Sequence, residues 1–318
     1  MSDYISNEVR KKFDFNIRDL YSTKRYNKNF KNINIYGVST INNPKNQSLI
    51  FVKRLSDEIE NKLIDIKNSL ILIKSDANIK NIILKNNECL FVENPRLEYA
   101  RILTFILSKQ DKKTRKYQSY DNYVIIGENT EIGENTKIEP FVFIDHDVKI
   151  GNDCIISTGA RIINNVSIGN NVIIGQNTII GGIGAAAEKD SDGELITIPH
   201  IGGVLIGNSV EIGALVTVQS GIIEPTTIED NVLIANHVSI AHNGYIKSGC
   251  ILTGSSVLGG SVEVDKNSWL GLNCTIKNGI KIGKNVLVGM GAVVRKSTKD
   301  NVIVAGYAAK EIPKFKKF

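Results

Sequence analysis

The chain has 318 residues, 42% of them hydrophobic, and a formal net charge of +6 that comes mostly from dispersed lysines. No run approaches the roughly 18 apolar residues that a membrane span needs, and no basic and aromatic stripe suited to nucleic acid is present. The N-terminus lacks the apolar core of a secretory signal. The four cysteines are scattered and form no CxxC pair. We therefore expect a cytoplasmic protein with reduced thiols.

Residues 1–120 are predicted to form a small α/β domain that could bind a nucleotide sugar. Apolar, β-branched runs predict strands at 48–52, 68–73 and 88–92. The stretch 94–109 predicts a helix, with Asn94 as its N-cap and a proline at its first position. The polar stretch "SKQDKKTRKYQSYDN" is expected to be a linker to the next domain.

From Ile126 onward, aliphatic residues recur every six positions, often followed by glycine. A helix would repeat near 3.6 residues and a half-buried strand at 2. A period of six is typical of a parallel β-helix in which three hexads make one triangular coil. We therefore predict a mainly β chain, with a left-handed parallel β-helix over residues 121–305 and a short basic tail over 306–318.

The six-residue phase slips twice, which predicts two insertions, near 183–203 and 219–226. A solenoid tolerates extra residues only where they leave the coil as loops. Such loops are candidates for the wall of a substrate site.

The stretch "NHVSIAHN" holds two of the four histidines, His237 and His242, both outside the inward aliphatic positions. Gly260 stacks on His242 one coil later and leaves room beside the ring. Three interpretations stay open: a general base, part of a zinc-type site that needs a third ligand, or surface histidines. The nearest third histidine, His200, lies out of phase in an inserted loop and does not fit as that ligand.

Thr253, Gly271 and Gly289 are predicted to stack in one column with little side-chain bulk. Such a column could hold the extended arm of a thioester donor against the backbone, although glycine is common in hexads for stacking alone. Lys296 and Lys310 could meet the phosphates of coenzyme A or could be ordinary solvated lysines.

Three segments in order along the chain carry a resemblance to a known family: "ENPRLEYARIL", "ITIPHIGGVLIGNSVEIGA" and "TTIEDNVLIANHVSIAHN". They resemble the UDP-3-O-acylglucosamine N-acyltransferases of lipid A synthesis and related nucleotide-sugar N-acyltransferases. The resemblance places the family's catalytic histidine on His242. Asn236, His237 and Asn243 are then expected to orient this base or the sugar.

The chain departs from that family in three places. In the family's uracil-binding pattern only Phe51 matches, and Arg54 and Asp57 replace an asparagine and a tyrosine. The loop "GGIGAAAEKDSDGE" replaces a segment of different composition. The ending "VGMGAVVRKSTKDNVIVAGYAAKEI" resembles that of sugar acetyltransferases that use coenzyme A.

These features together predict a homotrimeric sugar N-acyltransferase with His242 as its general base. The expected acceptor is a nucleotide-linked amino sugar for lipid A or a surface polysaccharide. The preferred donor is acyl-CoA, with acyl carrier protein as the alternative. We expect no tightly bound cofactor, no metal and no nucleic acid. The alternatives are a metal-dependent hydratase of the γ-carbonic anhydrase type and a non-catalytic solenoid scaffold.

Overall fold

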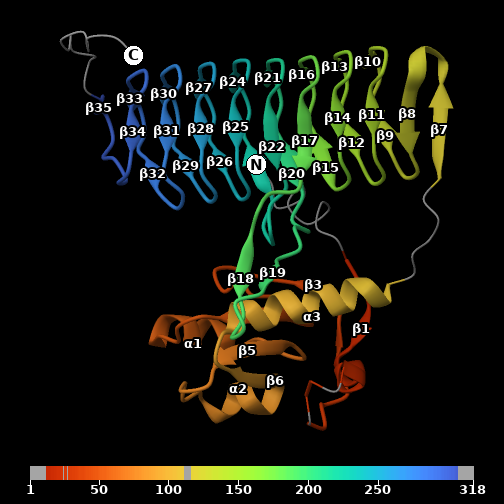
Figure 1. Cartoon of the computed structure of the whole chain (residues 1–318), viewed down its shortest axis with the longest axis vertical. Helices are drawn as coiled ribbons and strands as arrows, with labels where there is room; N and C mark the ends of the chain where they lie inside the picture. Colours follow the sequence, from red (N-terminus) through yellow and green to blue (C-terminus); the bar gives the residue numbers. More distant parts are fainter. Residues whose placement is uncertain (1–11, 24, 27, 111–115, 307–318) are drawn as a thin grey trace, which may run out of the picture.

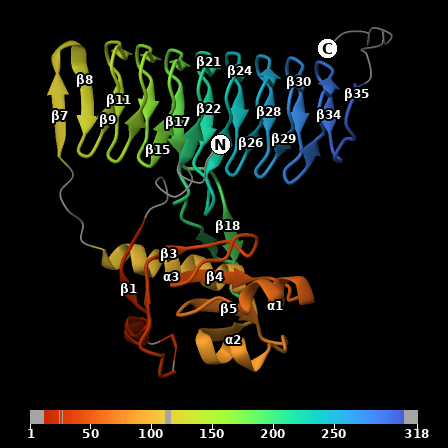
Figure 2. The same cartoon turned by 180° about the vertical axis from the view of Figure 1, so that it is seen from behind.

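The computed structural model describes residues 12–23, 25–26, 28–110 and 116–306 of the chain. A long solenoid forms one part of the molecule, and a compact domain from the N-terminal part of the chain hangs from its middle (Figure 1). Seen from behind, β18 (Ala187–Lys189) again reaches from the solenoid to the domain (Figure 2).

The solenoid has three flat faces, each a sheet of stacked short strands. The chain visits the first, second and third face in turn and then begins the next coil, so all pairings within the coils are parallel. This confirms the predicted left-handed parallel β-helix fold.

The strands of the first face are β7 (Tyr117–Tyr120), β8 (Val124–Gly127), β11 (Phe143–Ile144), β14 (Arg161–Ile162), β17 (Ile179–Gly182), β22 (Thr217–Gln219), β25 (Ser239–Ile240), β28 (Val257–Leu258), β31 (Thr275–Ile276) and β34 (Val293–Val294). Those of the second face are β9 (Glu131–Ile132), β12 (Lys149–Ile150), β15 (Val166–Ile168), β20 (Val204–Ile206), β23 (Thr226–Ile228), β26 (Tyr245–Ile246), β29 (Glu263–Val264) and β32 (Lys281–Ile282). Those of the third face are β10 (Lys137–Ile138), β13 (Ile155–Ile156), β16 (Ile173–Ile174), β21 (Glu211–Ile212), β24 (Leu233–Ile234), β27 (Ile251–Leu252), β30 (Trp269–Leu270), β33 (Leu287–Val288) and β35 (Ile303–Val304).

The aliphatic residues of the six-residue repeat form the solenoid core. On the first face Ile144 pairs with Ile162, and Ile162 pairs with Ile180; all three side chains are fully buried. Burying such a side chain stabilises a fold by about 1.5–3 kcal/mol. Many corners between faces carry asparagine with positive φ, such as Asn171 at 55°, because asparagine tolerates the left-handed conformation better than most residues.

The two slips in phase appear as longer steps between stacked residues. Asn152 donates from its backbone N–H to the Asn170 side chain 18 residues on, whereas Asn170 reaches Asn208 over 38 residues. Asn208 reaches Asp230 over 22 residues. The longer insertion contains β18 (Ala187–Lys189) and β19 (Leu195–Thr197), which pair as an antiparallel hairpin.

The N-terminal domain has a four-stranded parallel sheet in the order β3-β4-β5-β6. Its elements are β1 (Phe15–Asn16), the 3₁₀ helix η1 (Ile17–Thr23), β2 (Asn34–Ile35), β3 (Gly37–Val38), β4 (Ser48–Val52), α1 (Asp57–Leu63), β5 (Leu70–Lys74), α2 (Asn81–Asn86), β6 (Glu88–Val92) and α3 (Pro95–Lys109). The three predicted strands are β4, β5 and β6, and the predicted helix is α3. The Asn94 side chain accepts hydrogen bonds from the first-turn N–H groups of α3, as expected for an N-cap.

Ion pairs and a shared core attach the inserted hairpin to the N-terminal domain. Arg96 and Arg101 of α3 pair with Glu188 and Asp190 of the hairpin, the second pair at 3.0 Å. Four buried residues of the insertions also pack with the apolar core of the domain; these are Ala186, Ile198, Ile201 and Ile223. The insertions therefore hold the domain at one fixed place beside the solenoid.

The structure corrects one expectation at the start of the solenoid. Tyr117–Tyr120, expected to be part of a polar linker, forms β7, which pairs antiparallel with β8 on the first face. A short 3₁₀ turn, η2 (Asp121–Tyr123), connects the two strands. The predicted tail lies outside the described residues from position 307 onward. None of the helices in the described ranges is long and apolar enough to cross a membrane.

Candidate active site

His242 lies directly after β25, at the corner where the chain turns from the first face to the second. Its ring is half-buried, and Gly260 is its neighbour in the next coil, as the coil period predicts. A Cβ atom on Gly260 would lie 2.6 Å from both Cε1 and Nε2 of the His242 ring. Glycine at position 260 therefore provides the space that the imidazole occupies.

Asn243 fixes the proton on His242. The Asn243 side-chain Oδ1 accepts a hydrogen bond from the backbone N–H of Ile222 at 3.2 Å, and its Nδ2 donates to the carbonyl of Glu224 at 2.7 Å. These two bonds orient the amide so that Oδ1, an acceptor, faces His242 Nδ1 at 3.1 Å. Nδ1 then carries the proton, and Nε2 keeps a free lone pair. This is the tautomer that a general base needs.

His200 lies beside His242, although the sequence placed it out of phase. The inserted segment returns to the solenoid so that the two rings meet edge to face, with centroids 5.5 Å apart. His200 Nδ1 lies 3.1 Å from the carbonyl of Ile198, to which it donates, and its Nε2 is buried without a partner. Burial lowers the pKa of His200, and the nearby His242 lowers it further. His200 is thus a neutral imidazole beside the candidate base.

Gln219 is a second residue of this site that sequence reasoning missed. Its Oε1 accepts a hydrogen bond from the backbone N–H of His242 at 3.2 Å. Both His200 and Gln219 lie where the inserted segments leave or rejoin the coil. The only sequence signal for them is their place within or next to these insertions, because the hexad pattern does not extend into the loops.

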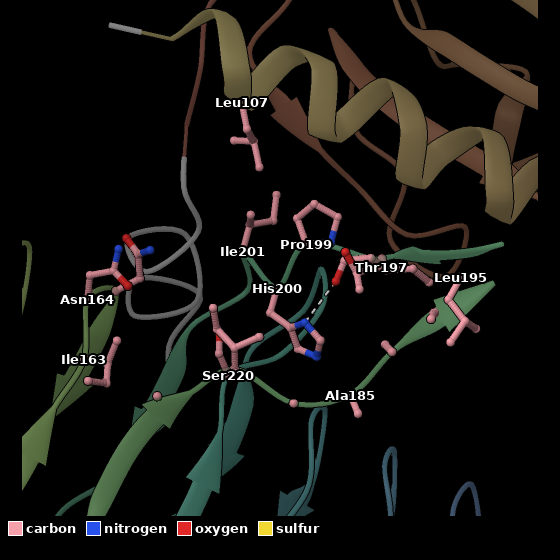
Figure 3. A pocket seen from close by; sticks show the side chains of 17 residues that line it. Leu107, Ile163, Asn164, Ala185, Leu195, Thr197, Pro199, His200, Ile201 and Ser220 are labelled. Carbon is pink, nitrogen blue, oxygen red and sulfur yellow. Dashed lines mark hydrogen bonds between the residues drawn. The ribbon is translucent and has the colours of Figure 1, made fainter. Parts of the chain in front are cut away.

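His200 also lines a pocket of about 650 Å³. Figure 3 shows the side chains around it: Leu107 of α3 on one side, Ile163 and Ser220 of the solenoid on another, and Ala185 and Leu195 of the insertion on a third. The pocket therefore has walls from the solenoid, the inserted hairpin and the N-terminal domain.

His237 and Asn236 lie at the opposite end of β25 from His242, at the corner between the third and first faces. His237 is exposed and has a φ of 61°, a conformation that asparagine holds at many other corners. The Asn236 side chain accepts a hydrogen bond from the backbone N–H of Ala214 at 2.8 Å, and so it stabilises the coil. The strand β25 therefore separates His237 from His242. Their predicted contact with the sugar stays a prediction.

The predicted donor column lies at the same corner as His237. The Thr253 hydroxyl donates to the carbonyl of Leu270 at 2.7 Å. A Cβ atom on Gly271 would lie 2.5 Å from the carbonyl oxygen of Val288, and one on Gly289 would lie 3.1 Å from Ala305. Close stacking of the coils thus accounts for the two glycines by itself. Their predicted role in holding the donor stays a prediction.

Lys296 lines a second pocket, of about 640 Å³, at the last coils of the solenoid. Lys277 and Arg295 line the same pocket, so three cationic side chains surround it. This arrangement is suited to phosphate groups. Lys310 lies outside the described residues.

Phe51 lies on β4 and packs against the buried Tyr99 of α3, with ring centroids 5.0 Å apart. It is half-buried and belongs to the apolar core of the N-terminal domain. Arg54 and Asp57, which replace the family's other two base-binding residues, line a shallow pocket at the start of α1. The described contacts of Phe51 are those of a packing residue, and its nucleotide contact stays a prediction.

Within the described part of the chain, no three histidine, cysteine or acidic side chains are grouped so that they could hold a metal ion. His200 and His242 are a pair without a third such residue.

Comparison with protein families identifies the repeat. The model named bacterial transferase hexapeptide (six repeats) matches residues 129–164 and 147–182. The hexapeptide repeat of succinyl-transferase matches residues 262–296. The matched segments lie in the solenoid, one before and one after the insertions and the candidate site.

Curated relatives include the UDP-3-O-acylglucosamine N-acyltransferase of Pseudoalteromonas translucida, 32% identical over 126 residues. That alignment covers 39% of this chain and 36% of the relative. The enzyme of the same name from Coxiella burnetii is 33% identical over 119 residues, 37% of this chain and 35% of the relative. The matched part thus spans about a third of the length of these relatives.

Solved structures with the same solenoid include the UDP-N-acetylglucosamine acyltransferase of Campylobacter jejuni, with a TM-score of 0.51, 25% identity, and coverage of 58% of this chain and 70% of that chain. The enzyme of the same name from Arabidopsis has a TM-score of 0.51, 25% identity, and coverage of 58% and 64%. The resemblance predicted from the motifs is thereby confirmed: the chain is similar to hexapeptide-repeat acyltransferases that are named for UDP-linked glucosamines.

Proposed function

We propose that this protein is an N-acyltransferase that moves an acyl group from a thioester to the amine of a nucleotide-linked amino sugar. The observation that carries the proposal is the hydrogen-bonded amide of Asn243, which leaves His242 Nε2 free to accept a proton. The names of the matched relatives supply the class of substrate. The product would enter lipid A or another surface polysaccharide.

The proposed reaction runs through a tetrahedral adduct. The amine nitrogen attacks the thioester carbonyl carbon while His242 Nε2 takes one of its protons. The C–S bond then breaks, and the imidazolium returns the proton to the departing thiolate. Asn243 acts as a positioning residue, because it holds the tautomer and orientation of the ring. A general base of this kind contributes roughly 10²–10⁴-fold to the rate.

The proposed donor is acyl-CoA, with acyl carrier protein as the alternative. The cationic pocket around Lys296 supports a phosphate-bearing donor, because Lys277 and Arg295 line it as well. The four cysteines are buried and free, which agrees with the cytoplasmic location proposed from the sequence.

A trimer is part of the proposal. The third face carries a row of exposed apolar side chains, between 36% and 73% exposed, at the outward position of its strands: Ile155, Ile173, Leu233, Trp269, Leu287 and Ile303. The second face carries charged pairs instead, such as Lys247 with Glu263 at 2.7 Å. An apolar row of this length is typical of a surface that meets other copies of the chain.

Kinetics of His242→Ala test the proposed base. We expect kcat/KM to fall by about 10²–10⁴ with KM for the sugar nearly unchanged. Asn243→Leu should reduce kcat less, and it should change the pH profile, because Nδ1 loses its acceptor. His237→Ala is the matched control: it removes a histidine from the other end of β25 and leaves kcat intact, and its effect on KM tests the predicted sugar contact. His242→Ala activity within about twofold of wild type would contradict the proposed role.

Binding identifies the substrates independently of turnover. A ligand that binds only the folded protein raises its melting temperature. We expect stabilisation by one UDP- or dTDP-linked amino sugar and by one acyl-CoA. A fall in melting temperature with a metal chelator would instead favour the hydratase alternative. No response to any of these compounds would favour the scaffold.

A further inference from the structure

The second insertion carries three consecutive residues, 222–224, that lie between the N-terminal domain and the candidate base. Their side chains contact the domain, and backbone groups of two of them bind the amide of Asn243. We propose that Thr40 of the N-terminal domain is a positioning residue for His242 and acts through Glu224 and Asn243. The inference rests on the proposed function, in which His242 is the general base.

The side chains of this segment hold it on the N-terminal domain. Ile223 is buried in the apolar core of the domain, and Ile222 packs against the same core. The Thr40 hydroxyl donates a hydrogen bond to the Glu224 carboxylate at 3.1 Å. Hydrogen bonds to an ionised group are roughly twice as strong as those between neutral groups. The carboxylate therefore ties the insertion to the loop that follows β3.

The turn that carries Thr40 is itself attached to the central sheet of the domain. The backbone N–H of Asn43 donates to the Thr40 carbonyl at 3.2 Å and closes the turn. The preceding residue, Ser39, is buried, and its hydroxyl lies 2.7 Å from the hydroxyl of Ser48 on β4. The position of the Thr40 hydroxyl therefore follows that of the whole domain.

The backbone of the same segment orients the amide beside the base. The N–H of Ile222 donates to Asn243 Oδ1 at 3.2 Å, and the carbonyl of Glu224 accepts from Asn243 Nδ2 at 2.7 Å. In this orientation Oδ1 lies 3.1 Å from His242 Nδ1. Glu224 thus binds the domain with its side chain and the amide of Asn243 with its carbonyl, so a shift of one contact moves the other.

Two glycines fix the position of the Glu224 carbonyl. A Cβ atom on Gly202 would lie 2.5 Å from its oxygen, and one on Gly221 would overlap it. The backbone N–H of Gly202 also donates to the carbonyl of Gly221 at 2.8 Å. Because close-packed groups leave little room for local adjustment, this carbonyl moves only with the segment as a whole.

Loss of the Thr40 hydrogen bond should change the protonation of the His242 ring. A loosened Glu224 carbonyl lets the Asn243 amide turn over, so that Nδ2 faces the ring in place of Oδ1. His242 Nδ1 must then accept a hydrogen bond, and the proton moves to Nε2. That tautomer has no lone pair at Nε2 for the proton of the attacking amine.

Four variants test this chain of contacts. Thr40→Val removes the hydroxyl at nearly constant volume, and Thr40→Ser keeps it. Thr23→Val is the matched control, because the Thr23 hydroxyl donates to the Leu20 carbonyl at 2.8 Å within η1 of the same domain. Ile223→Ala is a second disruptive variant, which removes the apolar anchor and leaves the hydroxyl in place. Melting temperatures establish that each variant folds.

NMR of the ring nitrogens, in the full chain labelled at histidine, reports the tautomer without any substrate. The chain has four histidines, so the signals of His242 are those that His242→Ala lacks. We expect the Nδ1–H tautomer in wild type, Thr40→Ser and Thr23→Val, and a mixture of tautomers in Thr40→Val and Ile223→Ala. Wild-type His242 signals in folded Thr40→Val and Ile223→Ala would overturn the inference.

Kinetics with acyl-CoA and a UDP-3-O-acylglucosamine measure the consequence for the reaction. We expect kcat of Thr40→Val to fall by roughly three- to thirtyfold, part of the 10²–10⁴-fold effect of a general base, with both KM values unchanged. The double variant Thr40→Val/Asn243→Leu should have the kcat of Asn243→Leu alone, because residues that act through one contact are not additive. Additive losses would show that Thr40 acts by another route and would refute the inference.

The two measurements separate this inference from the proposed reaction. A changed tautomer in Thr40→Val, without turnover of any substrate pair by wild type, would support the link to His242 and refute the acyltransferase. Turnover by wild type that Thr40→Val leaves unchanged, together with an unchanged tautomer, would refute the link and leave the acyltransferase standing.

Discussion

At the scale of single residues, two neighbours, Asn243 and Gly260, position the candidate base His242. Asn243 supplies an acceptor of fixed orientation at 3.1 Å from His242 Nδ1, and Gly260 leaves the neighbouring position empty. Because the amide of Asn243 is itself held by Ile222 and Glu224, the second insertion helps to orient the histidine. The base thus depends on groups that are distant in the sequence.

Gly260→Ala tests the space beside the ring. The new methyl group would meet the His242 ring at 2.6 Å, so the imidazole must move. We expect kcat to fall at least about tenfold, because a displaced base loses much of its 10²–10⁴-fold effect, with a stability loss of roughly 1–3 kcal/mol from overpacking. Both are measured by steady-state kinetics and urea unfolding.

Gly254→Ala is the control for that substitution. It adds the same methyl group one hexad earlier, where the nearest atom is the carbonyl oxygen of Asn236 at 3.4 Å. Its kcat should equal that of wild type. Full activity of Gly260→Ala would show that the position of the His242 ring does not limit the reaction.

At the scale of elements, the longer insertion joins the two parts of the molecule. Its hairpin pairs with α3 through Arg96 and Arg101, and its return places His200 against His242. The longer insertion thus contacts the N-terminal domain and also forms a wall of the site. It therefore links the position of the domain to the geometry of the site.

The buried His200 predicts a dependence of stability on pH. Its folded pKa lies below the value of 6.5 for a free histidine, so protons bind the unfolded chain more readily. The stabilisation from the neutral ring is therefore complete above about pH 6.5 and is lost as pH falls through the folded pKa. We expect the urea midpoint of wild type to drop more between pH 7.5 and pH 5.0 than that of His200→Gln.

Carboxylates elsewhere titrate in wild type and in His200→Gln alike. The difference between the urea-midpoint changes of these two proteins therefore reports the contribution of His200. His237→Gln, at an exposed corner, should behave like wild type across the same range. Identical midpoint changes for wild type and His200→Gln would contradict the burial of a neutral imidazole in the inserted segment.

At the scale of the whole molecule, the three faces of the solenoid differ in character. The third face presents exposed apolar residues such as Trp269 and Leu287, whereas the second presents ion pairs such as Lys281 with Asp265 at 3.1 Å. A charged face is stable in water, and an apolar one gains free energy when another copy covers it. This difference favours the third face over the second as the interface of the proposed trimer.

Trp269→Glu should dissociate that trimer. Trp269 is 50% exposed on β30 near the middle of the apolar row, and a charge there would be buried without a partner in the assembly. Sedimentation equilibrium should give about three times the chain mass of 35.0 kDa for wild type and a lower mass for the variant. Ser167→Glu, on the second face, should sediment like wild type. Equal masses for wild type and Trp269→Glu would exclude the third face as the interface.

The sequence by itself determined the solenoid and the position of its candidate base. A period of six needs only local geometry, because each hexad makes one strand and one corner, and identical positions must then stack. The column from His242 to Gly260 and the positions of the two insertions follow from the same period. The motif around His242 is one of the three that carry the resemblance to a class of enzyme.

Only the tertiary structure decided what the insertions do. His200, Gln219 and the walls of the pocket belong to or border segments without period, whose path depends on contacts with the N-terminal domain rather than on neighbouring residues. The same holds for Asn236, Gly271 and Phe51, whose described contacts are packing and backbone hydrogen bonds. The residues of a repeat take their positions because each coil pairs in register with the coil before it. A loop has no such pairing, so its position depends on long-range packing.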